Sequence, residues 1–208
     1  MTVEKFEFRK AYPELYAPGS GDFMLVQVPP LQFLACDGHG DPNTSAEYSG
    51  ALACLYPVAY TLKFASKKDL GRDFTVAPLE GLWRADDMDA FTRREKDTWD
   101  WTMLLAQPEW ITGDMVQTAV TAVRNKKGLP GLERLRLFRL EEGTAVQILH
   151  RGPYNDEGPV LERLHHQWMP AHGLTFNGDH HEVYLSDPRR TAPEKLRTVL
   201  RQPVRPAA

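Results

Sequence analysis

The segment HHEVYLSDPRR, residues 180–190, has the alternating pattern of a β-strand that runs into a turn. Successive side chains of a strand point to opposite faces, so Glu182 and Tyr184 share one face. Val183 and Leu185 share the other face, where they are expected to pack under a helix. Glu182 must then reach water or enter a cavity. In an aromatic cavity its carboxylate could act as a general base or attract a cationic ligand; a solvated glutamate is the alternative.

Two longer helices are expected before this strand. The first should begin near Thr44, because Thr44 and Glu47 have the spacing of a capping box, and Pro57 should bend it. The second should begin at about Thr112 and end before Gly128, which follows a basic last turn. A shorter helix is expected within residues 154–173.

Strand patterns fill much of the remaining chain. Pro29 and Pro30 interrupt an extended stretch, which makes it an edge strand or two short pieces. A segment with Gly143 at its turn reads as a hairpin. The expected strands lie within residues 23–36, 73–83 and 97–108, and the hairpin within residues 132–151.

The order strand, helix, strand, strand occurs twice, which indicates a duplication. Residues 23–108 form the first expected module and residues 132–208 the second, joined by a connecting helix in residues 109–131. Residues 1–22 are expected to form an N-terminal arm that packs by its aromatic side chains. We therefore predict a single α+β domain over residues 1–208, in which two modules pack together and leave a groove between them.

Large flat side chains share one face of the last strand of the first module, where Trp101 and Met103 alternate with polar residues. Such a face is either protein core or the wall of a small-molecule site. Together with Glu182 it favours a site for flat, hydrophobic compounds, cations included. Glu80 is either a second acid of this site or an exposed strand-end carboxylate, and Gly81 could form a bulge that re-aims its neighbours. The predicted ligand-binding residues are Tyr60, Lys63, Glu80, Trp83, Trp101, Met103 and Tyr154.

Composition narrows the classes of function. The net charge is −3 and the pI is near 6.2, so no basic surface indicates a nucleic-acid partner. The N-terminus lacks the apolar core of a signal peptide, and no apolar run is long enough to cross a bilayer. We therefore expect a cytoplasmic protein with no membrane partner.

Histidine and cysteine patterns give little support to metal or cofactor chemistry. His165 and His166 are adjacent and cannot share a face of a helix, while His180 and Glu182 share a strand face without identifiable further ligands. Both cysteines lie in apolar surroundings, as expected for buried reduced thiols. The chain also lacks G-x-S-x-G and a phosphate loop, so we predict no metal and no cofactor.

Four segments resemble the GyrI-like small-molecule-binding domain proteins: HHEVYLSDPRRTAPEKLRTVLRQPV, VAPLEGLW, WTMLLAQPEWIT and HRGPYNDEGPVLERL. The resemblance extends from about Phe23 to Val204, and its most specific part is E-x-Y-L-S-D-P followed by TAPEKL. It implies an antiparallel sheet with helices on one side, two modules related by a pseudo-twofold axis, and a ligand pocket between them. Glu182 then corresponds to a central pocket carboxylate, with Tyr184 beside it and aromatic walls around both.

The resemblance leaves two principal functions open, because a fold alone does not give an activity. Stand-alone relatives include hydrolases that open strained cyclopropane rings in DNA-alkylating natural products. In such an enzyme Glu182 would activate a water, Tyr184 would orient it, and aromatic side chains would hold the substrate. Other relatives are effector domains of drug-sensing regulators, which implies a binding or sequestering module without chemistry. Inhibition of a topoisomerase is a third reading that rests on the family name, and the sequence fits a monomer or a homodimer.

Overall fold

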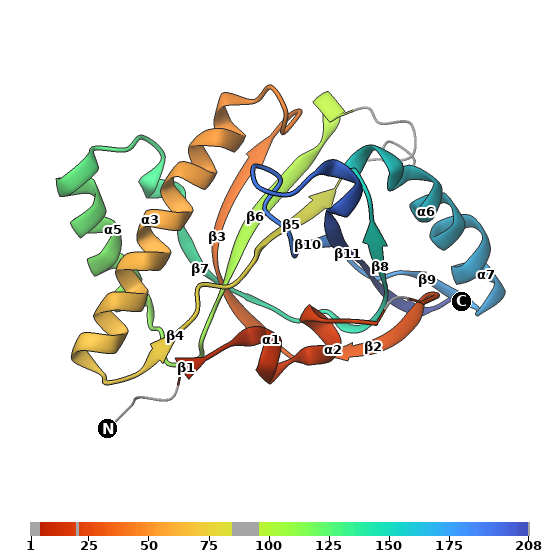
Figure 1. Cartoon of the computed structure of the whole chain (residues 1–208), viewed down its shortest axis with the longest axis horizontal. Coiled ribbons are helices and arrows are strands. Elements are labelled where there is room, and N and C mark those ends of the chain that lie inside the picture. The colour runs from red at the N-terminus through yellow and green to blue at the C-terminus, as the bar shows by residue number, and fades with distance from the viewer. Residues whose placement is uncertain (1–4, 20, 85–95, 208) are drawn as a thin grey trace.

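The computed structural model describes residues 5–19, 21–84 and 96–207, which contain both strands and helices (Figure 1). Up to the middle of the chain these are β1 (Lys5–Phe6), α1 (Phe8–Ala11), α2 (Pro13–Tyr16), β2 (Met24–Val28), β3 (Leu31–His39), α3 (Ala46–Asp69), β4 (Asp73–Phe74), β5 (Leu79–Arg84), β6 (Asp100–Gln107) and α5 (Gly113–Lys127). They continue with β7 (Arg136–Leu140), β8 (Gly143–Arg151), α6 (Gly158–Arg163), a π-helical turn (Leu164–Trp168), α7 (Met169–Ala171), β9 (Leu174–Phe176), β10 (His180–Tyr184) and β11 (Arg197–Pro206).

The large sheet has the strand order β2-β8-β11-β10-β5-β6-β3-β7, with β9 paired to β11, and all of these pairs are antiparallel. Strands β3, β5 and β6 of the first module lie on one side of the centre, and β8, β10 and β11 of the second lie on the other. The two modules therefore meet at β5 and β10, where Glu182 is the cross-strand partner of Gly81. This arrangement confirms the predicted α+β class.

The two ends of this sheet come together. Strand β2 lies at one end and β3 near the other, yet Pro29 and Pro30 are the whole link between them. Two residues reach only about 7–10 Å, so the sheet must curl until its ends meet. The register of β2 on β8 continues without a shift into that of β3 on β7. Each pair, β2 with β3 and β7 with β8, is thus one long bent strand.

This curvature corrects one expectation. The segment at residues 132–151 was expected as a hairpin, but β7 pairs with β3 while β8 pairs with β2 and β11. The chain bends at Glu141 and Glu142 instead of reversing, and Gly143 follows with a φ of 64°. The interrupted stretch around Pro29 and Pro30 does form two strands, as one of the two readings stated.

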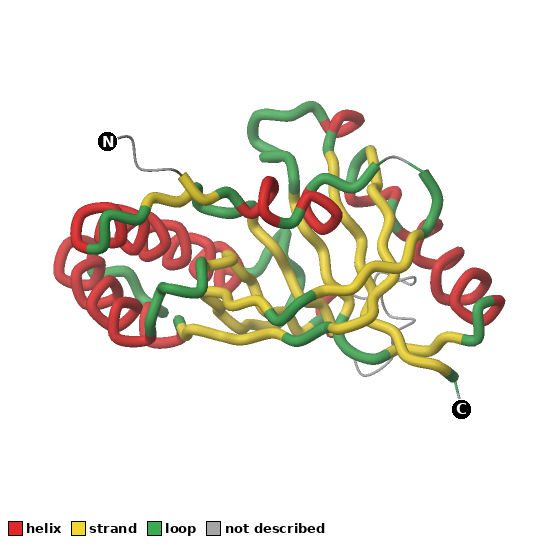
Figure 2. Tube along the Cα trace, turned by 90° about the horizontal axis from the view of Figure 1, so that it is seen from below, coloured by secondary structure: helices red, strands yellow, loops and turns green. Residues whose placement is uncertain are grey.

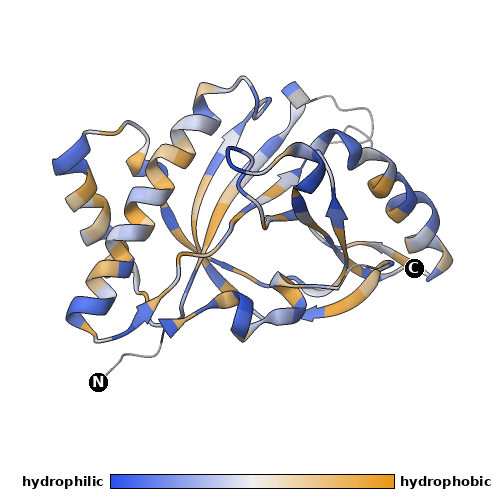
Figure 3. Ribbon diagram, viewed as in Figure 1, coloured by the Kyte–Doolittle hydropathy of each residue, from blue (hydrophilic) through white to orange (hydrophobic). Residues whose placement is uncertain are grey.

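Helices cover both faces of the sheet. Figure 1 shows α3 and α5 at one end of the molecule and α6 and α7 at the other, with the central strands between them. These helices pack into one hydrophobic core, and along α3 and α5 hydrophobic residues alternate with hydrophilic ones (Figure 3). The short helices α1 and α2 of the N-terminal arm cover the opposite face with Phe8, Leu15 and Tyr16 (Figure 2). The expected helical layer is present, and the arm adds a second, smaller one.

Helix α3 begins one residue later than the capping-box spacing suggests. Ser45, not Thr44, is the N-cap, and its Oγ accepts a hydrogen bond from the Tyr48 amide at 3.2 Å. Glu47 does not complete a capping box because its carboxylate is bound by Arg134 and by the amide of His39. Helix α5 has the predicted N-cap, Thr112, and the predicted Gly128 follows its last turn with a φ of 57°.

Candidate functional site

Strand β10 has two different faces. The face that carries His180, Glu182 and Tyr184 is called the site face here, and the face that carries His181 and Val183 is called the arm face, because the N-terminal arm covers it. On neighbouring strands, the side chains beside the site-face residues are Trp83 of β5 and, farther along, Trp101 and Met103 of β6. Five of the predicted site residues, Glu182, Tyr184, Trp83, Trp101 and Met103, are therefore brought to one face.

Tyr184 connects the carboxylate to the aromatic wall. Its hydroxyl accepts a hydrogen bond from the Trp83 indole at 3.0 Å, and the ring of Tyr154 packs edge-on against it at 5.7 Å. Burial raises the pKa of Tyr184 well above its usual value, and the charge of Glu182 and a hydrogen bond to it raise it further. The phenol is thus held protonated beside the carboxylate, where it can orient a bound group.

Two further tyrosines approach Glu182 from opposite modules. Tyr48 of α3 stacks on Trp83 at 6.4 Å and meets Trp101 edge-on at 5.3 Å. Burial, followed by the charge of Glu182, raises the pKa of Tyr48. Tyr154, at the turn before α6, has its pKa raised to about 12 by burial, Glu157 and Glu182, in that order. The charge of Glu182, which lies between the two modules, therefore contributes to the raised pKa of all three tyrosines.

Glu182 is neither solvated nor enclosed. Its side chain is 13% exposed, and its Oε1 lies 3.4 Å from Nε2 of His180, whose side chain is 1% exposed. The cross-strand position is Gly81, where an added Cβ would lie 2.8 Å from Trp83 Nε1 and 3.3 Å from the Tyr184 hydroxyl. Gly81 keeps a regular register and forms no bulge; its missing side chain instead leaves the space that Trp83 and Tyr184 occupy.

Trp101 and Met103 lie beneath this cluster without any exposed surface. The Trp101 ring covers Gly38, and its indole donates a hydrogen bond to the carbonyl of Gly40 at 3.2 Å. These two residues therefore support the wall formed by Trp83 and the tyrosines rather than presenting a surface to a ligand.

Three predicted residues lie elsewhere. Tyr60 is 48% exposed on α3, where it stacks on Phe64, and Lys63 of the same helix forms an ion pair with Asp73 of β4. Glu80 is completely buried on the arm face, because it directly precedes Gly81 in the strand and so points the opposite way. Glu80 is therefore not an exposed strand-end acid, and as a predicted ligand-binding residue it lies on the face opposite to Glu182.

Glu80 belongs to a buried ionic network on the arm face. Its two oxygens accept from the Tyr16 hydroxyl at 2.8 Å and contact Nε2 of His181 at 3.0 Å. Nδ1 of His181 contacts Glu142 at 3.0 Å, and Arg201 donates to the other oxygen of Glu142 at 3.3 Å. Burial disfavours a charge on His181, but Glu142 and Glu80 outweigh it and raise the pKa of His181 to about 9. Likewise, despite burial, His181 and Arg201 lower the pKa of Glu142 to about 2.

The network also fixes the N-terminal arm. Arg201 donates to the carbonyl of Leu15 at 3.1 Å, and Gln147 donates to the carbonyl of Glu14 at 2.7 Å. These carbonyls belong to the last turn of α2, which has no partners for them within the helix. Spacing along the sequence does not predict this network, because the residues of the network come from five distant segments.

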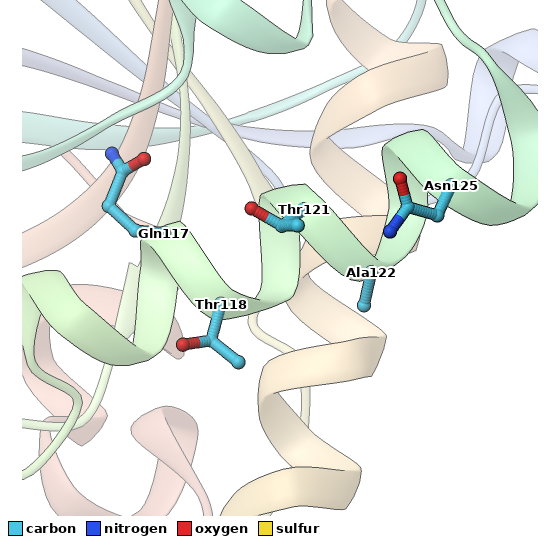
Figure 4. A pocket seen from close by; sticks show the side chains of 5 residues that line it. All are labelled: Gln117, Thr118, Thr121, Ala122 and Asn125. Atoms are coloured by element: carbon cyan, nitrogen blue, oxygen red, sulfur yellow. The ribbon is translucent and has the colours of Figure 1, made fainter.

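Two hollows lie away from Glu182. One, of about 480 Å³, lies along the outer face of α5 and is lined by Gln117, Thr118, Thr121, Ala122 and Asn125 (Figure 4). The other, of about 440 Å³, lies between the arm and the end of α3, beside Trp110 and Arg72. Neither brings together groups suited to catalysis. Neither is lined by Glu182 or by the tyrosines around it.

Within residues 5–19, 21–84 and 96–207, no three His, Cys, Asp or Glu side chains are grouped to hold a metal ion. None of the helices in that part of the chain has the length and apolar character needed to cross a membrane.

Comparison with known proteins gives one family. Residues 22–205 match the GyrI-like small molecule binding domain. No match is found among the curated proteins compared.

Solved structures agree with this match. An uncharacterized conserved protein from Listeria innocua is 38% identical, with a TM-score of 0.88 over 97% of this chain and 100% of that one. A hydrolase from Listeria innocua is 37% identical, with a TM-score of 0.84 over the same shares. The EcmrR C-terminal domain shares the fold, with a TM-score of 0.59 and 13% identity over 89% of this chain and 98% of that one.

Proposed function

The chain belongs to the GyrI-like small-molecule-binding domain family, and we propose that its ligand binds against Glu182, between the helices of the two modules. One observation carries this proposal: a partly exposed carboxylate lies at the centre of the sheet among three tyrosines and Trp83. Most small-molecule sites combine an apolar, aromatic lining with a few polar groups in this way.

The chemistry of these walls selects a class of ligand. Aromatic faces attract flat rings through stacking and attract cations through the ring quadrupole. A carboxylate between such faces adds a full negative charge in a partly dry setting. We therefore assign to the site flat, hydrophobic compounds that carry a positive charge or an electron-poor carbon.

For a ligand with a strained, electron-poor cyclopropane, we propose hydrolysis. Glu182 takes a proton from a water molecule whose oxygen forms a bond to a ring carbon. The carbon–carbon bond of the ring breaks, and its electron pair moves into the conjugated carbonyl group, which becomes a phenolate. The proton on Glu182 then neutralises that phenolate. The protonated Tyr184 hydroxyl orients the water, and the 37% identical hydrolase from Listeria innocua supports this class of reaction.

The second candidate is binding without chemistry. The same ring of tyrosines around one carboxylate suits a cationic aromatic compound as a counter-charge, with no requirement for a reactive carbon. The protein would then sequester or sense such a compound. Stoichiometric binding without product distinguishes this function from hydrolysis.

One experiment tests both. The wild type and Glu182→Gln are incubated with a spirocyclopropyl cyclohexadienone, followed by mass spectrometry, and titrated with the cationic dye rhodamine 6G, followed by tryptophan fluorescence. We expect the variant to lose turnover, to keep its affinity for the neutral dienone within about tenfold, and to bind the dye more weakly. Glu194→Gln, at an exposed position, is the control. Normal turnover by Glu182→Gln would show that Glu182 is not the general base. If dye binding were unchanged as well, the ligand would not bind against Glu182.

A further inference from the structure

His180 approaches Glu182 from the protein interior. The two residues are separated by one position on β10 and share the site face, and Nε2 of His180 lies 3.4 Å from Oε1 of Glu182. The histidine side chain is 1% exposed while the glutamate side chain is 13% exposed. One oxygen of the carboxylate therefore lies beside the buried imidazole.

The surroundings hold the His180 ring in place. Trp83 is its cross-strand partner on β5, and the ring of His165 meets it edge-on with centroids 6.5 Å apart. His165 belongs to the π-helical turn and packs in turn on Phe176 at 4.9 Å. Single π-helical turns recur at functional sites.

His165 does not compete with His180 for the carboxylate. Burial, then the charges of His180 and His166, lower the pKa of His165 to about 3, so this ring is neutral near pH 7. This neutral ring offers no charge to His180, whose Nε2 lies 3.4 Å from the carboxylate of Glu182.

We propose that His180 is a positioning residue for Glu182, an inference that rests on the function proposed for that carboxylate. Its Nε2–H donates to Oε1 and so fixes the plane of the carboxylate, which directs Oε2 toward the bound water or ligand. At 3.4 Å the two atoms do not form a hydrogen bond in this structure, but catalytic contacts often tighten only when the ligand is present. A misplacement of the base by 1 Å is enough to cost about a hundredfold in rate.

The first test separates positioning from binding by kinetics with the spirocyclopropyl dienone. His180→Phe keeps a flat buried ring and removes the donor; we expect kcat to fall by about tenfold to a hundredfold with KM little changed. His180→Gln places an amide N–H near the position of Nε2 and should recover most of the lost kcat. His39→Phe removes an exposed histidine that pairs with Asp100 instead of Glu182, and should retain the wild-type kcat.

The outcomes are separable. If Glu182→Gln loses turnover or dye binding while His180→Phe behaves as the wild type, the positioning role is wrong and the proposed function stands. If Glu182→Gln also behaves as the wild type, the proposed function itself fails.

A second measurement decides the case if His180→Phe does not fold or if the protein only binds. The ring nitrogen resonances of His180 are recorded by NMR in the wild type and in Glu182→Gln, with exposed His172 as the internal reference. If His180 donates to Glu182, the chemical shifts of the His180 ring nitrogens should change in the variant while those of His172 stay the same. Unchanged His180 resonances would overturn the inference.

Discussion

Strand β10 carries a histidine on each face, and each histidine faces a glutamate in a different setting. On the arm face His181 lies between Glu80 and Glu142 at 3.0 Å from each, and its side chain has no exposed surface. On the site face His180 meets Glu182 at 3.4 Å, and part of that carboxylate reaches solvent. The two histidines of β10 thus differ: His181 is completely paired with buried carboxylates, whereas His180 faces a carboxylate that is partly open to solvent.

The difference concerns what each carboxylate can still do. The two acids of the arm face are balanced by His181 and Arg201 and have hydrogen bonds to both oxygens, so they have nothing to offer a ligand. A buried and satisfied network of this kind fixes one arrangement of the chain. The side chain of Glu182, by contrast, remains partly exposed to solvent. Measurements of what each face contributes to stability test this difference.

The largest effect is expected from Arg201→Met. Without Arg201, His181 must balance the buried carboxylates of both Glu80 and Glu142, and such removal of one partner of a buried ion pair typically costs about 3–5 kcal/mol. The variant also leaves the carbonyl of Leu15 without its donor. Urea denaturation followed by tryptophan fluorescence measures the free energy of unfolding. Arg205→Met, at an exposed position of the same strand, is the control and should stay within about 0.5 kcal/mol. Equal values for the two variants would show that the network does not stabilise the fold.

High pH should weaken the arm face next. The pKa of His181 is raised from 6.5 in the unfolded chain to about 9 in the folded protein. Its contribution is therefore complete below pH 6.5 and is lost as the pH rises through about 9. The shift corresponds to a few kcal/mol, on the order of 3.

The measurement compares unfolding free energies at pH 6.5 and pH 10 in the wild type and in His181→Gln. Lysines and tyrosines also titrate in this range, so the difference between the two proteins is the quantity of interest. We expect the wild type to lose more stability than the variant. Parallel curves would show that His181 is not held charged by its carboxylates.

A smaller loss is expected from Tyr16→Phe. This change removes the hydroxyl that donates to Glu80 at 2.8 Å and keeps the ring packed on Phe8. A buried acceptor left without its donor costs about 1–3 kcal/mol. Tyr12→Phe in the same arm is the control, because Tyr12 is only half-buried, and its effect should stay within about 0.5 kcal/mol. Thermal denaturation measures the Tm of both variants. An equal change in Tm would contradict an anchoring role for the Tyr16 hydroxyl.

Several of these features follow from local sequence rules. The alternation of residues 180–184 places Glu182 and Tyr184 together, and the same rule could have excluded Glu80, which is three positions from Trp83 and so faces the other way. The expectation of a bulge at Gly81 obscured that point. Helix α5 also begins and ends where its capping residues indicate, since caps act within a single turn.

The remainder depends on the curl of the sheet. Two residues between strands are compatible with a hairpin or with a bend, and only contacts with distant strands decide between them. Because β7 and β8 form one bent strand, Glu142 at the bend lies beside His181 and Arg201. Tyr48 of α3 packs on Trp83 and forms part of the wall around Glu182. No spacing rule connects such residues.

The smallest effect is expected from Glu182→Gln on stability, in contrast to its effect on the ligand. The amide has nearly the same shape, the carboxylate is partly solvated, and its contact with His180 is long, so the free energy of unfolding should change by no more than about 0.5 kcal/mol or should rise. Glu80→Gln is the matched change on the arm face, where it leaves charged His181 with one carboxylate instead of two and should cost about 1–3 kcal/mol. Urea denaturation of both variants at pH 7 gives the two values side by side. A loss at Glu182 as large as that at Glu80 would mean that Glu182 is a structural residue, and the distinction between the two faces of β10 would then have no functional meaning.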